Sequence, residues 1–238
     1  LGLLIQSGRK SIQRVLVCLD VTNAVIDEAL RNNVDTILTF HPLIFTAMRS
    51  IHSDDRVGSC VEYAIQHNIA VVSAHTNVDA HPLGTNDAFA TALGWSTESL
   101  LVPDQRVAGH GMGVLCRINP CSLDDILAKV RIVCGSPLRW CEGSSPVVNT
   151  VAIICGSGSS FLPAARKAGA DVCITADVRY HTFHENVGRM SVVDPGHYEM
   201  EQFIPERLAS LLRSMVLGAE SNVEVLVSAV STNPLRYT

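Results

Sequence analysis

Histidine and carboxylate side chains stand near the carboxyl ends of three predicted β-strands. His41 directly follows the apolar run Thr36–Phe40, and Asp79 and His197 lie in the segments after two further strands. Glu201 comes four residues after His197 at the predicted start of a helix, so both side chains share one helical face. The carboxyl ends of parallel strands meet at one edge of a sheet, where ligands bind. This placement predicts a divalent-metal site, although a lone HxxxE pair is also typical of an ordinary helix surface.

Two more histidines are candidates for proton transfer. His75 precedes Asp79 by four residues, in a segment predicted to be a loop, and His181 lies in the motif ADVRYH after a predicted strand. Imidazole titrates near neutral pH and can therefore carry protons in an active site. A hydrogen-bonded structural role fits His181 equally well. We name His75 and His181 as the candidate catalytic residues.

The loop Gly156–Ser160, with the sequence GSGSS, connects a predicted strand to a predicted helix. Backbone N–H groups at such a helix start can bind phosphate. A dinucleotide-binding fingerprint requires a third glycine where this chain has Phe161, although Asp177 stands at a suitable distance for a ribose contact. A tight turn is the preferred interpretation and a phosphate site is the alternative. No residue is assigned to an organic cofactor.

The elements that position these residues alternate between short apolar strands and amphipathic helices. Strands are predicted at residues 15–19, 36–40, 69–74, 151–155, 172–175, 191–193 and 223–227, and helices at 24–30, 61–67, 123–130, 161–167 and 199–216. Such alternation is typical of mostly parallel sheets with helices on their faces. The predicted fold class is therefore α/β.

The two halves of the chain resemble each other at an offset of 136 residues. The segment that begins VLVCLDVT at Val15 aligns without a gap with the segment that begins VAIICGSG at Val151. Any two strand–helix–strand units look partly alike, which is the competing explanation. We predict two related α/β lobes, at residues 1–110 and 111–238, that face each other across a cleft. The first carries the HP and HTxxD motifs, and the second carries GSGSS, ADVRYH and GHxxxE.

Composition limits the classes of partner. Hydrophobic residues make up 47% of the 238 residues and charged residues 17%, which excludes a largely disordered chain. The net charge of −5, without a cluster of lysine or arginine, argues against nucleic-acid binding. No apolar run reaches the roughly 18 residues of a membrane span. The eight cysteines form no CxxC pair and are expected to be reduced thiols in a cytoplasmic protein.

Several blocks of sequence together resemble the Nif-three-like family, once described as type-two homologues of GTP cyclohydrolase. After the opening GLL at residues 2–4, the blocks are residues 15–45, 75–94 (HTNVDAHPLGTNDAFATALG), 156–181 and 194–202 (DPGHYEMEQ). They follow the family's order over nearly the whole chain. The resemblance implies a two-lobed α/β fold, often assembled as a toroidal homohexamer, with a dinuclear metal site that faces the interior.

The same resemblance assigns residues to the site. By position, the metal ligands are His41, Asp79, His197 and Glu201, and Glu201 bridges the two ions. A mixed set of nitrogen and oxygen ligands suits Zn²⁺, Fe²⁺ or Mn²⁺ better than Ca²⁺ or Mg²⁺. The chain departs from the commonest pattern at Phe40, where many relatives have a second histidine before the proline. Because phenylalanine cannot bind a metal, we expect one or two ions per chain.

Three functions remain open from the sequence. The favoured one is a metal-dependent hydrolase that acts on a nucleotide or another phosphorylated small molecule, with His75 and His181 as proton carriers. The second is a non-catalytic, metal-binding, ring-forming scaffold that engages protein partners. The third is a dinucleotide-binding oxidoreductase that uses the loop Gly156–Ser160.

Overall fold

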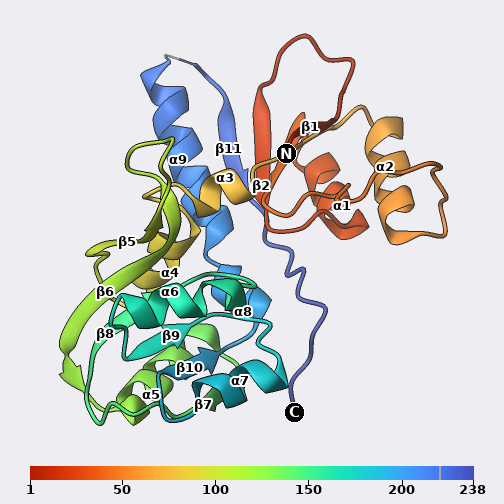
Figure 1. Cartoon of the computed structure of the whole chain (residues 1–238). Helices are drawn as coiled ribbons and strands as arrows, with labels where there is room; N and C mark the ends of the chain where they lie inside the picture. The colour runs from red at the N-terminus through yellow and green to blue at the C-terminus, as the bar shows by residue number, and fades with distance from the viewer. Residues whose placement is uncertain (220) are drawn as a thin grey trace. The chain divides into compact units, whose positions relative to one another are not determined.

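The computed structural model describes residues 1–219 and 221–238 and divides into two compact units. The first unit comprises residues 1–77 and 204–234, and the second comprises residues 78–203 and 235–238. Each unit is built on one β-sheet flanked by helices (Figure 1). The predicted α/β fold class is therefore confirmed. The predicted division after residue 110 is a different partition of the chain and stays a prediction.

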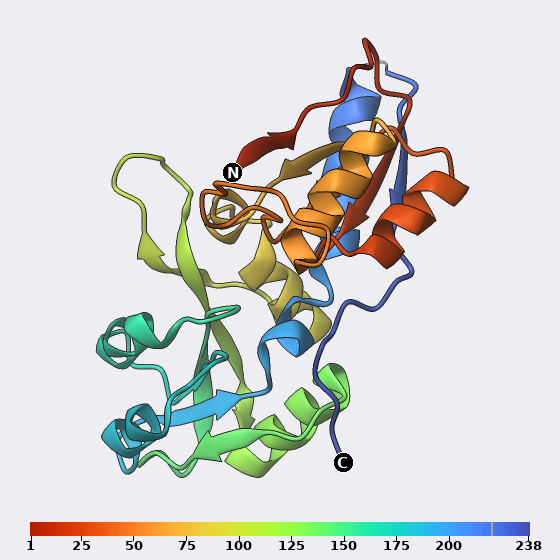
Figure 2. The ribbon, with the colours of Figure 1, turned by 90° about the vertical axis from the view of Figure 1, so that its right-hand side faces the viewer.

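The first unit contains a five-stranded sheet in the order β1-β4-β3-β2-β11. Its strands are β1 Gly2–Ile5, β2 Arg14–Cys18, β3 Thr36–Thr39, β4 Ala70–Ser73 and β11 Glu224–Val227. Its helices are α1 Asn23–Arg31, α2 Arg56–Gln66 and α9 Ile204–Gly218. β1 is antiparallel to β4, and all other neighbouring strands are parallel. Figure 2 shows α1 and α2 in front of this sheet and α9 behind it.

The core of the first unit follows from the alternation of side chains along its strands. Leu16 and Cys18 of β2 point to one face of the sheet, where they pack in the same apolar cluster as Ile26 of α1 and Val61 of α2. Val17 points to the other face and is fully buried as well. Both faces are therefore covered, which accounts for strands that are almost continuously apolar.

The second unit contains a six-stranded sheet in the order β5-β6-β8-β9-β10-β7. Its strands are β5 Ser99–Pro103, β6 Gly111–Cys121, β7 Arg139–Cys141, β8 Val148–Ile153, β9 Val172–Ile174 and β10 Ser191–Asp194. Its helices are α4 Thr85–Ala92, α5 Leu123–Cys134, the short 3-10 helix η1 Ser159–Phe161, α6 Leu162–Lys167, α7 Tyr180–Asn186 and α8 His197–Glu201. β8, β9 and β10 are parallel, whereas the other pairings are antiparallel.

Two apolar clusters cover the two faces of this second sheet. Val151 of β8 packs in one cluster with residues of α4 and α5, and the next residue, Ala152, packs in the other with residues of α6. Apolar side chains thus pack against both faces of the sheet along β8, β9 and β10. The loops that follow these strands start from fixed positions.

Two predicted segments have a different secondary structure, and the helix predicted over 61–67 begins five residues earlier, as α2. The helix predicted over 199–216 is two helices, because α8 ends at Glu201 and α9 begins at Ile204. Pro205 explains the break, since proline has no N–H to donate and its ring clashes with the carbonyl group four residues earlier. The loop predicted between His75 and Asp79 contains a single helical turn, α3 Thr76–Asp79. Across residues 1–219 and 221–238, no helix has both the length and the apolar character needed to span a membrane.

Equivalent elements occur in the two units at the predicted offset. Helix α1 corresponds to η1 together with α6, and β3 corresponds to β9. The edge strands follow the same rule, because β1 pairs antiparallel with β4 and β7 pairs antiparallel with β10. The order β1-β4-β3-β2 in one sheet is therefore repeated as β7-β10-β9-β8 in the other.

An equivalent corner in each unit contains an aspartate whose side chain accepts hydrogen bonds from the backbone. Oδ2 of Asp35 accepts hydrogen bonds from the N–H groups of Gln13 and Arg14, at 2.7 and 2.9 Å. Oδ2 of Asp171 accepts the same pair of bonds from residues 149–150, at 2.8 and 3.0 Å. Asp35 and Asp171 occupy equivalent positions and accept equivalent hydrogen bonds. The general similarity of any two strand–helix–strand units does not require such bonds, so they support a true repeat.

Candidate metal centre

The centre of the site in the second unit is the pair His197 and Glu201, the first and last residues of α8. Nε2 of His197 lies 3.0 Å from Oε2 of Glu201. The helical spacing thus brings the two side chains together as the sequence predicts. The Glu201 carboxylate is only 3% exposed. A carboxylate this deeply buried requires a positively charged partner.

Asp177 holds His197 from the other side of the ring. Its Oδ2 lies 2.7 Å from Nδ1 of His197. Asp177 follows β9 and has a backbone φ of 54°, in the left-handed region that few residues with a side chain adopt. Histidines that bind metals usually donate their second ring nitrogen to a carboxylate in this way. From the sequence, Asp177 was considered only for a ribose contact, and its role in orienting His197 was not predicted.

The carboxylates of Glu201 and Asp177 stabilise the protonated, positively charged form of the His197 imidazole. The hydrogen bond to Glu201 raises the pKa of His197 to about 9, although burial acts in the opposite direction. The charge of Glu201 and the contact with Asp177 add to the increase. The site therefore binds a proton strongly between Nε2 and the carboxylate, where a metal cation can take its place.

Gly156 leaves open the space next to both candidate ligands. Its φ is 65°, and a Cβ at this position would lie 2.7 Å from Oε1 of Glu201 and 3.4 Å from Nε2 of His197. Any other residue would push against the ligand atoms. The N–H group of Gly158 in the same loop already donates to Oγ1 of Thr175 at 2.9 Å. These contacts favour the tight-turn interpretation of GSGSS over a phosphate site.

Asp79 ends the helical turn α3 and lies in the second unit. Its Oδ1 accepts a hydrogen bond from the Thr85 hydroxyl at 2.9 Å, and its backbone carbonyl accepts one from the Asn86 amide at 3.0 Å. The pKa of the Cys155 thiol is raised by burial and, next, by the charges of Glu201 and Asp79. Both carboxylates therefore lie in the neighbourhood of this thiol.

In the first unit, Asp20 orients His41. Nδ1 of His41 lies 2.9 Å from Oδ1 of Asp20, and Oδ2 of Asp20 accepts a hydrogen bond from the Thr232 hydroxyl at 2.8 Å. Burial acts to raise the pKa of Asp20, but the hydrogen bond and the charge of His41 outweigh it and lower that pKa. The contact of His41 with Asp20 has the same form as the contact of His197 with Asp177. Asp20 was not predicted as a site residue, although it too follows the end of a strand.

Phe40 and His75 pack around His41. The Phe40 ring is fully buried, and its centroid lies 5.1 Å from the His41 ring and 4.9 Å from the His75 ring. The His41 and His75 centroids are 5.6 Å apart. The first unit thus places His75 next to a predicted ligand, and Phe40 forms an apolar wall beside both imidazoles.

His181, the other predicted proton carrier, lies on the exposed surface of α7. Its ring packs against Tyr180, with a centroid distance of 5.4 Å. Among the described residues, no hydrogen bond joins His181 to His197 or Glu201. The structure therefore does not bring it into the imidazole–carboxylate cluster.

The sequence pattern did not indicate two further residues, Glu199 within α8 and Tyr237 near the C-terminus. Glu199 is 3% exposed. The Tyr237 hydroxyl donates to Glu199, and burial together with this bond raises the pKa of Tyr237 to about 12. Both residues belong to the second unit. Their contact joins residues far apart in the chain, so no local motif could have shown it.

Comparison with known proteins finds relatives over the length of the chain. The family model described as Duf34/NIF3 (NGG1p interacting factor 3) matches residues 1–234. A Clostridium acetobutylicum protein named GTP cyclohydrolase 1 type 2 homolog is 32% identical, and the match covers 99% of this chain and 90% of that protein. The crystal structure of a hypothetical protein from Staphylococcus aureus has a TM-score of 0.92 at 26% identity, over 100% of this chain and 91% of that one. A Bacillus cereus protein related to NIF3 has the same fold, with a TM-score of 0.90 at 23% identity over 100% of this chain and 92% of that one.

Proposed function

The chain belongs to the Duf34/NIF3 family, and on this premise we propose that it is a divalent-metal-binding hydrolase for a nucleotide or another phosphorylated small molecule. The observation that supports this most strongly is the His197–Glu201 pair with the open space at Gly156 beside it. The family name alone does not identify a substrate. The proposal therefore rests on what these side chains can bind and orient.

The residues present fit a divalent cation. Asp79, His197 and Glu201 offer carboxylate oxygens and one imidazole nitrogen in the second unit, a donor set that suits Zn²⁺, Fe²⁺ or Mn²⁺. His41 is proposed as a further ligand from the family resemblance and from its orientation by Asp20. We propose one or two ions, which Asp79, His197, Glu201 and His41 would hold.

In the proposed mechanism the chain's own residues orient ligands and move protons. A bound ion would supply Lewis acidity toward a substrate oxygen and a water molecule. Asp177 fixes the ring of His197 by its contact at Nδ1, which directs Nε2 toward the ligand position. His75, which packs against His41, is the proposed proton carrier beside that ligand. His181, on an exposed helix, is proposed to exchange protons with the solvent.

The alternative is a non-catalytic, metal-binding scaffold that forms rings and engages protein partners. Phe40 favours this alternative, because its fully buried ring offers no ligand atom where many relatives have a second histidine. A homohexamer and a cytoplasmic location are proposed for either function, from the resemblance and from the reduced cysteines.

Metal content tests the site. We expect Glu201→Gln to lower the divalent metal retained after dialysis at least tenfold, because the amide loses the negative charge that binds the cation. Glu185→Gln makes the same change on the exposed surface of α7 and should retain the wild-type content. Asp177→Asn should weaken metal binding by about 10- to 100-fold through the orientation of His197. Wild-type metal content in Glu201→Gln would show that the site assignment is wrong.

Turnover tests the reaction. The metal-loaded protein is incubated with a panel of nucleotides and phosphoesters, and hydrolysis products are measured by chromatography. We expect hydrolysis that depends on added metal and is lost in Glu201→Gln but kept in Glu185→Gln. Full metal occupancy without turnover on the panel would instead support the scaffold.

A further inference from the structure

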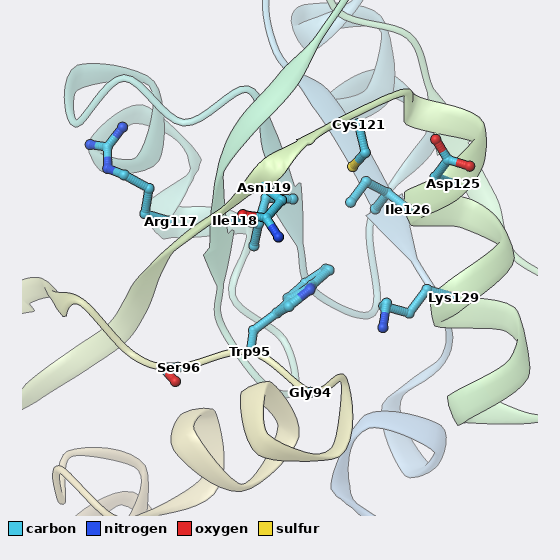
Figure 3. A pocket seen from close by; sticks show the side chains of 10 residues that line it. All are labelled: Gly94, Trp95, Ser96, Arg117, Ile118, Asn119, Cys121, Asp125, Ile126 and Lys129. Atoms are coloured by element: carbon cyan, nitrogen blue, oxygen red, sulfur yellow. The ribbon is translucent and has the colours of Figure 1, made fainter.

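A cavity of about 480 Å³ lies in the second unit, and its lining contains none of the proposed metal ligands. It is formed by the turn after α4, the end of β6 and the first turns of α5 (Figure 3). Cavities of this size accept small organic molecules. The side chains around it show which chemistry such a molecule would have.

Trp95 supplies a fixed aromatic surface in this cavity. Figure 3 shows its indole ring projecting into the space between Asn119 and Lys129. The ring is half-buried and packs against the apolar cluster that contains Ile126, and its backbone N–H donates to the carbonyl of Ala90 at 2.9 Å. An indole held in place by packing can stack on a planar ligand at little entropic cost.

Lys129 supplies a positive charge. Its Nζ donates one hydrogen bond to the carbonyl of Leu93, at 3.1 Å. An ammonium group has three N–H donors, so two remain for an anionic group on a ligand. Arg117 does not serve this purpose, because its Nε lies 3.3 Å from Oε2 of Glu98 and its side chain extends away from Trp95.

Asp125 supplies an acceptor one helical turn before Lys129, on the same face of α5. Its Oδ2 accepts hydrogen bonds from the N–H and the hydroxyl of Ser122, at 3.0 and 2.6 Å, and thereby caps the helix. Oδ1 is the oxygen that can accept from a ligand. The wall formed by α5 therefore has a positive end and a negative end.

We propose that this cavity binds a planar, anionic small molecule with an N–H donor. Its ring would stack on Trp95, its anionic group would bind Lys129, and its donor would bind Asp125. Adenosine monophosphate has all three features and is the probe of choice. This binding site does not depend on the proposed metal chemistry.

Tryptophan fluorescence provides the test. The chain has two tryptophans, and Trp140→Phe, at a position 42% exposed, leaves Trp95 as the reporter. We expect a saturable change in emission with adenosine monophosphate. Binding should be at least tenfold weaker for adenosine, which lacks the phosphate, and for purine riboside monophosphate, which lacks the amine. Absence of binding at millimolar adenosine monophosphate, or equal binding of all three, would overturn the proposal.

Variants assign the roles of the residues. Lys129→Gln should remove the preference for adenosine monophosphate over adenosine, whereas Lys167→Gln, the same change on the exposed surface of α6, should keep it. Trp95→Leu, followed by calorimetry, should bind neither ligand while its circular dichroism spectrum stays that of the wild type. If inorganic phosphate displaces the nucleotide at equal concentration, or if Lys129→Gln keeps the preference, the proposed planar anion site is wrong.

Discussion

Two imidazoles in this chain have their Nδ1 atoms against a carboxylate, His41 against Asp20 and His197 against Asp177. Each contact determines which ring nitrogen remains for a ligand. Glu201 adds a buried negative charge at the Nε2 side of His197. These are the arrangements expected of residues that bind a cation, and at Glu201 and His197 the adjacent space is left open by Gly156.

That space gives the first prediction. Gly156→Ala would put a Cβ 2.7 Å from Oε1 of Glu201, in a backbone conformation with a φ of 65°. We expect metal affinity to fall at least tenfold, measured by titration against a competing chelator. Stability should fall by about 1–3 kcal/mol, from the strain at positive φ and from the displaced carboxylate.

Gly169→Ala separates these two effects. Gly169 has a φ of 77°, but a Cβ there would meet no atom within 4 Å. This variant should lose about 1 kcal/mol of stability and keep wild-type metal affinity. Equal metal affinities in both variants would mean that the space at Gly156 does not matter for the site.

Among the elements, the corner held by an aspartate recurs in both units and stabilises the start of a central strand. Asp35 and Asp171 each accept two backbone hydrogen bonds, and Asp35 also pairs with the half-exposed Arg9 at 3.0 Å. Removal of such a carboxylate leaves two backbone donors without their partner, which costs about 2–4 kcal/mol. The exposed ion pair adds little to this value.

The second prediction follows from this local role. Asp35→Ala should speed amide hydrogen exchange at Gln13 and Arg14, and Asp171→Ala should do the same at residues 149–150. Each variant should also unfold at a lower urea concentration. Asp124→Ala, at an exposed position, is the control and should change neither measurement. Equal exchange in Asp171→Ala and the wild type would contradict the repeated role.

The elements also show what the sequence can reveal. The alternation of strands and helices is a local pattern, and the predicted α/β class was confirmed, but strands β1, β5, β6 and β7 and helices α4 and α7 were not predicted. The spacing of His197 and Glu201 correctly predicted their contact, and their role as metal ligands stays a prediction. The break before Pro205 was missed because the segment 199–216 was interpreted as one continuous amphipathic helix. Asp20, Asp177 and Gly156 were not recognised, since their contacts join separate strands and depend on how those strands pack.

Buried cysteines occur in both units of the molecule, and their effect on stability can be measured as a function of pH. Six of the eight thiols are buried, and Cys121 and Cys155 are partly exposed. Burial raises the pKa of Cys18, Cys116 and Cys173 from 9.0 to about 12. The native chain therefore keeps protons that the unfolded chain releases in alkaline solution.

The third prediction is the resulting loss of stability at high pH. A group whose pKa is higher in the folded state contributes stability that is complete below its unfolded pKa and is lost as the pH rises toward its folded pKa. For Cys173 this window runs from about pH 9 to about pH 12. Each such thiol steepens the decline by up to about 1.4 kcal/mol per pH unit. Cys173→Ala should therefore make the decline shallower by about that amount.

The difference between the slopes of unfolding free energy against pH in the wild type and in Cys173→Ala reports on Cys173 alone. Lysines and tyrosines titrate in the same range, but they are unchanged in the variant. Unfolding is followed by the fluorescence of Trp95 and Trp140, which lie in the same unit as Cys173. Cys121→Ala, at a partly exposed thiol, should change the slope less, since its burial is smaller. Absolute stability will differ among the variants through the lost side-chain contacts, but this offset does not depend on pH. Parallel curves for Cys173→Ala and the wild type would therefore show that the buried thiol ionises as readily in the native chain as in the unfolded one.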